Sequence, residues 1–280
     1  MFSKKYIMIK ENGTILIPID FSKQSLVAVK NSYNIGRFTK SKLLLMHVFS
    51  KPEEENKAGL KKLAEQTATE SGLVCEFVSL KGDIFEETDK MAVKIDASLI
   101  VAGLDPHVKF RSFMGSSTAS KFIKNSPCPV LTTRAANYSP ECRSIVMPFD
   151  LSAESREKVG TVIQVAKYFG ADIRIVSIFD PNDAKYENHM LPYLHQVKKY
   201  IKDRSVNCSN KSIPDKNVAE SIVEYANKND CDLIVQMNKK DLSLGEMFSG
   251  TMSQRMVDIS NIPVLTINPM KRESISSGIH

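Results

Sequence analysis

The chain has 280 residues, 42% hydrophobic and 25% charged, a composition that is ordinary for a soluble globular protein of about two domains. Its five cysteines form no CxxC pair, and no stretch approaches the roughly 20 apolar residues of a membrane span, which excludes a disulfide framework and a membrane protein. The net charge is +6, but the basic residues form no dense stripe, so no nucleic acid partner is expected. The N-terminus shows no apolar leader, which predicts a cytoplasmic protein.

The first predicted strand, Thr14–Ile19, belongs to a sequence segment that occurs twice. ILIPIDFS at residues 15–22 is matched by IVMPFDLS at residues 145–152. Residues 43–50, 97–103 and 126–133 then have counterparts, in the same order, at residues 173–180, 231–237 and 260–267. Four matches in one order predict an internal duplication.

Each copy alternates strands and helices. In the helix after the first strand, Leu26, Val29 and Tyr33 recur at helical spacing and are expected to face the core. The strand runs show no clean alternation, which indicates burial on both faces, as in a parallel sheet. The other predicted elements are a helix over Asn56–Thr69, a strand over Val74–Leu80 and a helix over Ile84–Lys94, with counterparts at His189–Asp203, Val206–Ile213 (a ragged edge strand) and Val218–Asn227.

These elements predict an α/β protein with two tandem, doubly wound, five-stranded parallel sheets. The segment AANYSPECR at residues 135–143 is polar and contains a proline, so the linker is expected there. The predicted organisation is a first domain at 1–136, a linker at 137–143, a second domain at 144–269 and a mobile tail at 270–280.

The ILIPIDFS opening, the LIVAG strand, the Gly115-Ser116-Ser117-Thr118 segment and the PCPVLTT close together resemble the universal stress protein family, once per half. The resemblance implies a Rossmann-like fold of the adenine nucleotide alpha hydrolase type and a role in the stress response. Some family members bind ATP and others do not, and many are cytoplasmic dimers. By the same resemblance, Val130–Thr132 and Val264–Thr266 are expected to pair within this chain as an internal pseudo-dimer.

In nucleotide-binding members of the family, the pattern is Gly, two residues, Gly, nine residues, then Gly followed by Ser or Thr. Copy one has Gly103, a proline at position 106 and Gly115-Ser116, so it keeps two of the three glycines. Glycines let the backbone approach phosphates, and a helix start accepts an anion. The resemblance implies an ATP site, with Mg²⁺, in the first domain only. The candidate nucleotide-binding residues are Pro18, Asp20, Val48, Gly103, Lys109, Arg111, Gly115, Ser116, Ser117 and Thr118.

Two of these candidates have a plainer interpretation. By resemblance, Asp20 lies near the ribose or base, and Val48 offers backbone contact to the adenine ring. Alternatively, Asp20 begins a loop and caps the next helix together with Ser22, and Val48 is a core valine. In copy two, Met237 and Lys240 replace the first two glycines, and we expect no ATP there in the usual manner.

The sequence contains no GxxxxGK[ST], GxGxxG, GxSxG or HExxH motif, and its five histidines have no recognisable ligand spacing. We therefore expect no metal site and at most slow ATP hydrolysis. Two functions remain open, which are nucleotide sensing through copy one and a nucleotide-free scaffold for protein–protein contact. Whether two chains form a homodimer also remains open.

Overall fold

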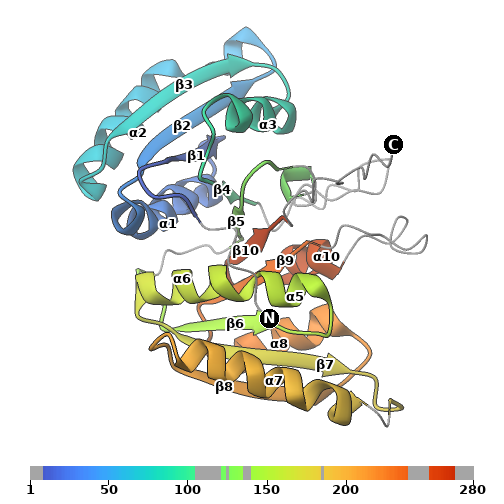
Figure 1. Ribbon diagram of the computed structural model, residues 1–280. Coiled ribbons are helices and arrows are strands. Elements are labelled where there is room, and N and C mark those ends of the chain that lie inside the picture. The colour runs from blue at the N-terminus through green and yellow to red at the C-terminus, as the bar shows by residue number, and fades with distance from the viewer. Residues whose placement is uncertain are drawn as a thin grey trace, which may run out of the picture.

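A computed structural model describes residues 9–104, 121–123, 126–134, 140–183, 186–238 and 252–268 (Figure 1). They form one ten-stranded sheet in the order β3-β2-β1-β4-β5-β10-β9-β6-β7-β8, with helices on both faces. None of the helices in these ranges combines the length and the apolar character that crossing a lipid bilayer demands.

The first half contains β1 (Thr14–Ile19), α1 (Lys23–Thr39), β2 (Lys42–Phe49), the 3-10 turn η1 (Pro52–Glu54), α2 (Lys57–Ser71), β3 (Cys75–Lys81), α3 (Ile84–Lys94), β4 (Leu99–Gly103) and β5 (Val130–Thr133). The second half contains β6 (Ser144–Pro148), α5 (Ala153–Glu157), α6 (Val159–Phe169), β7 (Asp172–Phe179), α7 (Tyr186–Lys202), β8 (Cys208–Pro214), α8 (Val218–Lys228), β9 (Leu233–Met237), α10 (Met252–Ile259) and β10 (Val264–Ile267).

Each half is a parallel five-stranded sheet, and the two halves join through their last strands. β10 pairs antiparallel with β5, with Val264 opposite Thr132 and Thr266 opposite Val130. The Thr132 hydroxyl also donates a hydrogen bond to the Val264 carbonyl oxygen at 3.2 Å. The doubly wound α/β fold and the predicted pairing of the last strands are both confirmed. Since each strand covers the edge of the other, the junction hides two sheet edges.

The core consists of two apolar layers, one on each face of the sheet. Along β1, Ile15, Ile17 and Ile19 enter one layer and Leu16 enters the other. All six residues of β1 are buried. Burial on both faces explains why the strand sequences are continuous apolar runs.

Most predicted elements lie within two or three residues of their observed positions, and α3 has the predicted bounds. Two details of the prediction are wrong. Leu26 is 38% exposed, whereas Val27 and Ala28 are buried and α1 packs on β4. β8 is an edge strand, as expected, but it is regular and stays in register with β7 from Cys208 to Pro214.

Candidate functional site

The carboxyl ends of β1, β2 and β4 lie side by side in the first domain. β1 is flanked by β2 and β4, and its register sets Ile19 beside His47. One residue further along, Asp20 follows β1 and Val48 lies near the end of β2. Gly103 is the last residue of β4, on the other side of β1. The fold thus gathers Asp20, Val48 and Gly103 at one edge of the sheet.

Pro18 marks the place where β1 and β4 part. The pairing of β1 with β4 covers only Ile15 and Leu16, whereas its pairing with β2 continues to Ile19. Proline has no N–H with which to extend a ladder. The strand order also reverses between β1 and β4. Ligands of doubly wound sheets bind outside the carboxyl ends of the strands at such a point.

Asp20 is exposed and belongs to the start of α1. Its carboxylate accepts a hydrogen bond from the Ser22 N–H at 2.9 Å, and the Ser22 hydroxyl oxygen accepts one from the Ser25 N–H at 3.2 Å. Partial burial raises the pKa of the Asp20 carboxyl, but hydrogen bonds from Ser22 and Ser25 outweigh it, and the net pKa is lowered. Asp20 therefore presents a negative charge at neutral pH.

An aromatic pair fixes the loop after β1. Phe21 has a left-handed φ of 62°, a conformation that costs a residue with a side chain roughly 1–2 kcal/mol. Its ring contacts the ring of the buried His47 edge-on, with centroids 5.1 Å apart. One nitrogen of His47 lies 2.8 Å from the Ile19 carbonyl oxygen, so the imidazole is attached to the end of β1. This packing fixes the path that the chain takes at Asp20, where it leaves the sheet.

Gly103 lies against the first turn of α1. A Cβ at this position would be 2.2 Å from the carbonyl oxygen of Gln24 and 2.5 Å from the backbone nitrogen of Ser25. Because both are backbone atoms, no side-chain rotation could relieve the contact. The close packing of α1 on β4 therefore requires a glycine here, independently of the phosphate contact that the sequence pattern predicts.

The second domain repeats the cap. The Ser152 N–H donates to the Asp150 carboxylate at 2.9 Å, the Ser152 hydroxyl donates to the same oxygen, and the Ser155 N–H donates to the Ser152 hydroxyl oxygen at 3.1 Å. The capping interpretation of the Asp–Ser pair is thus confirmed in both domains. Since both domains share it, the cap alone does not distinguish a ligand-binding domain.

The two domains differ at the position of Gly103. Its counterpart Met237, at the end of β9, is 4% exposed and lies in the same core layer as Val159. The helix after β6 is interrupted at Lys158, between α5 and α6, whereas α1 is continuous. A buried methionine thus stands in the second domain where the first has a glycine packed on a helix backbone.

Lys158 is a site residue that the sequence analysis missed. It is 5% exposed and stands in the repeat where α1 has the buried Ala28. Burial raises the pKa of the Asp150 carboxyl, whereas hydrogen bonds from Ser152 and Ser155 and the nearby charge of Lys158 lower it, and the net pKa is lowered. The signal available in the sequence was that a lysine stands at the repeat position of Ala28.

The described residues thus bring together Pro18, Asp20, Val48 and Gly103. Six other predicted site residues lie outside them, namely Lys109, Arg111, Gly115, Ser116, Ser117 and Thr118. Within the described ranges, no group of three or more His, Cys, Asp or Glu side chains is arranged to hold a metal ion.

Comparison with known proteins finds a family match on each half of the chain. The model of the universal stress protein family matches residues 11–134 and again residues 141–268. Universal stress protein MJ0531 of Methanocaldococcus jannaschii is 27% identical over 148 residues, which cover 47% of this chain and 85% of that protein.

Solved structures agree in fold. A universal stress protein from Archaeoglobus fulgidus DSM 4304 has a TM-score of 0.71 at 15% identity and covers 95% of this chain and 100% of its own. A structure described as a putative universal stress protein from Pseudomonas aeruginosa UCBPP-PA14 has a TM-score of 0.70 at 19% identity and covers 93% of this chain and 95% of its own. The two family matches, one on each half of the duplicated sheet, show that the chain belongs to the universal stress protein family, with two such domains in tandem.

Proposed function

We propose that the chain is a cytoplasmic stress-response protein that senses an adenine nucleotide, ATP with Mg²⁺, through its first domain, and that the second domain has lost this capacity. The nucleotide would lie outside the carboxyl ends of β1 and β4, beside Asp20. It would act by favouring one conformation of the protein over another, which requires different affinities for the two conformations.

One observation carries this proposal, which is the contrast between Asp20 and Asp150. Asp20 is an exposed residue at the point where β1 and β4 part, and no cation is among the causes that lower its pKa. Asp150 is partly buried and lies near the buried cation of Lys158. The large side chain of Met237 adds to the difference, because it stands where the first domain has a glycine. The first domain therefore has the more accessible acceptor.

A second function is favoured by the surroundings of Gly103. This glycine is required by the packing of α1 even when no ligand is bound. A chain that kept it for packing alone would act as a nucleotide-free scaffold for protein–protein contact.

The repeat supplies a matched pair of variants for the test. We would titrate ATP and ADP, each with and without MgCl₂, into the full chain by isothermal titration calorimetry. Asp20→Ala and Asp150→Ala each remove a capping carboxylate, and Asp150→Ala also removes the negative charge near Lys158, so the thermal midpoint of each variant is measured beside its affinity. Asp20→Ala should weaken ATP binding by roughly 10- to 150-fold, since a hydrogen bond to a charged group contributes about 1.5–3 kcal/mol. Asp150→Ala should leave it unchanged.

The outcomes separate the two functions. No heat of binding at millimolar ATP would refute nucleotide sensing and leave the scaffold. Equal weakening by both substitutions would contradict the assignment to the first domain, and weakening by Asp150→Ala alone would place the nucleotide in the second.

A further inference from the structure

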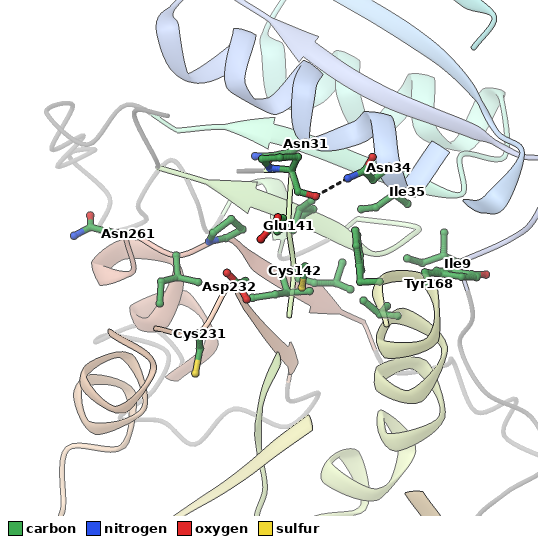
Figure 2. A pocket seen from close by; sticks show the side chains of 18 residues that line it. Ile9, Asn31, Asn34, Ile35, Glu141, Cys142, Tyr168, Cys231, Asp232 and Asn261 are labelled. Carbon is green, nitrogen blue, oxygen red and sulfur yellow. Dashed lines mark hydrogen bonds between the residues drawn. The ribbon is translucent and has the colours of Figure 1, made fainter. Parts of the chain in front are cut away.

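The acidic side chains at the junction of the two halves have donors as partners. Figure 2 shows Glu141 and Asp232 beside the cavity that lies there. Glu141 forms an ion pair with Arg143. Asp232 accepts hydrogen bonds from the backbone N–H groups of Arg143 and Ser144, at 2.8 and 3.0 Å. Each acceptor is thus matched by a donor. The surroundings of the His47 ring are different, because they offer it acceptors on both sides.

His47 lies near the end of β2, is 7% exposed, and has a carbonyl oxygen beside each ring nitrogen. Nδ1 is 2.8 Å from the carbonyl oxygen of Ile19, and Nε2 is 3.1 Å from the carbonyl oxygen of Glu54. A neutral imidazole has one N–H and one lone pair, so it can donate to only one of these oxygens. Only the imidazolium, which has two N–H groups, can donate to both.

The exposed turn that contains Glu54 depends on this contact. None of the residues of η1, Pro52–Glu54, is buried. The Glu54 carboxylate accepts hydrogen bonds from the N–H groups of Ser50 and Lys51, at 3.0 and 3.2 Å, and the Glu54 N–H donates to the Lys51 carbonyl oxygen at 3.0 Å. These bonds close the turn on itself. Within the described part of the chain, the contact with His47 is thus the hydrogen bond that joins η1 to a strand of the sheet.

The other carbonyl group belongs to a rigid part of the fold. Ile19 is 1% exposed and is the last residue of β1, which pairs with β2 along its whole length. Its carbonyl oxygen cannot move away without disturbing the sheet, whereas η1 is exposed. We therefore expect a neutral ring to keep its hydrogen bond to Ile19 and to release Glu54. Since Asp20 follows Ile19, this contact lies at the same edge of the sheet as the candidate site.

The charged groups near His47 keep their charge between pH 6 and 8. Hydrogen bonds from the backbone N–H groups of Ser50 and Lys51 lower the pKa of the Glu54 carboxyl, and the net pKa of Asp20 is lowered as well. A lysine such as Lys51 loses its charge only at higher pH. Histidine is the side chain that changes its charge between pH 5 and 8. The other neighbours are apolar, namely the rings of Phe21 and Phe49 and, in the helices that cover this face, Val29 and Leu60.

We propose that His47 is a pH-sensitive link: as an imidazolium it joins the carbonyl oxygens of Ile19 and Glu54, and as a neutral imidazole it keeps Ile19 and releases the η1 turn. A hydrogen bond to a charged group shifts an equilibrium by roughly 10- to 150-fold. The detached form of the turn becomes more populated by that factor when the charge is lost. Acidification therefore fixes η1 beside the end of β1. The link needs no nucleotide, so it stands or falls separately from nucleotide sensing.

Nuclear magnetic resonance of the full, ligand-free chain between pH 5.5 and 8.5 tests the proposal. The ¹⁵N chemical shifts of the two ring nitrogens report the protonation of His47, and backbone order parameters S² of the amides at positions 51, 53, 54 and 55 report the order of the turn. A rigid backbone has S² of about 0.85 and a flexible one below about 0.6. At pH 5.5 both ring nitrogens should carry a proton and the turn should be rigid. At pH 8.5 one proton should be lost and S² should fall below about 0.6, with the same midpoint for both changes.

Two variants identify the group responsible. His47→Asn retains a donor near the position of Nδ1, cannot reach Glu54, and is uncharged at every pH, so its turn should be flexible at both ends of the pH range. The ring signals that disappear in this variant also assign His47 among the five histidines of the chain. His189→Asn replaces an exposed histidine of α7 and should keep the pH response of the wild type. The amide spectrum of each variant establishes that it is folded.

Several results would overturn the proposal. The ring of His47 could change its protonation while the order of the turn stays constant, or it could keep one charge state over the whole pH range. A folded His47→Asn chain whose turn is as rigid as that of the wild type at pH 5.5 would show that the imidazolium does not hold it. If this variant does not fold, the wild-type titration decides alone, because two separate midpoints would mean that another group controls the turn.

Discussion

The contact between Gly103 and α1 makes Gly103→Ala a sharp test of how the first domain is built. The new Cβ would lie 2.2 Å from the Gln24 carbonyl oxygen, while ordinary contact begins at 3.4 Å, so a movement of about 1.2 Å is needed. Only the end of β4 or the start of α1 can supply it. Overpacking of this kind costs about 1–3 kcal/mol, and the upper half of that range applies because the opposing atoms are backbone.

A smaller effect opposes this loss. Replacing glycine by alanine restricts the unfolded chain and stabilises a protein by about 0.4–1 kcal/mol where the native conformation suits alanine. The net expectation for Gly103→Ala is a loss of about 2 kcal/mol in the free energy of unfolding. For a chain of 280 residues, this corresponds to a fall of roughly 3–4 °C in Tm.

Calorimetry and urea unfolding of the ligand-free protein measure this loss. The urea midpoint should fall while the slope m stays constant, since the surface exposed on unfolding is unchanged. The counterpart Met237→Ala should also destabilise, by about 2–5 kcal/mol, for the opposite reason that it leaves a cavity. A wild-type midpoint for Gly103→Ala would refute the packing argument, and the need for glycine would then rest on ligand approach alone.

Three further changes have definite expected outcomes. Lys158→Met should raise the pKa of Asp150, which is measured from its carboxyl carbon chemical shift. Because the folded-state pKa of Asp150 is lowered, its ionisation stabilises the protein above about pH 4, and that stability is lost as the pH falls through the folded-state pKa. The variant should therefore lose less stability than the wild type on acidification. Ser22→Ala should lower the free energy of unfolding by about 1 kcal/mol in urea titrations, through loss of the α1 cap, and an unchanged midpoint would contradict the cap. Gln164→Leu should speed hydrogen exchange of the Ile9 amide, and equal exchange in both proteins would show that this hydrogen bond gives no protection.

Much of the fold could be predicted because its signals are local or repeated. The apolar run Thr14–Ile19 has the bounds of β1, and α3 occupies the predicted Ile84–Lys94. The duplication also predicted part of the topology, since two copies of one parallel sheet have equivalent last strands. The prediction that residues 130–132 and 264–266 pair came from the family resemblance, and the antiparallel register confirms it.

The candidate site was less predictable, because its residues acquire their surroundings from distant segments. Asp20 and Ser22 are neighbours in the sequence, so their capping role could be inferred locally. That Gly103 abuts the Gln24 backbone depends on how α1 lies on β4. That Lys158 is buried near Asp150 depends on the interruption between α5 and α6.

The sequence by itself determined that the chain is duplicated, that its strands are buried on both faces, and where most helices begin, because hydrophobic periodicity and caps are properties of nearby residues. Only the tertiary structure decided which side chains face each other across the domain junction, among them Phe38 and Tyr168, and that the amide of Asn31 is buried without an acceptor. These contacts arise where the two halves of the ten-stranded sheet meet, and local sequence patterns do not determine how closely the helices of the two halves pack.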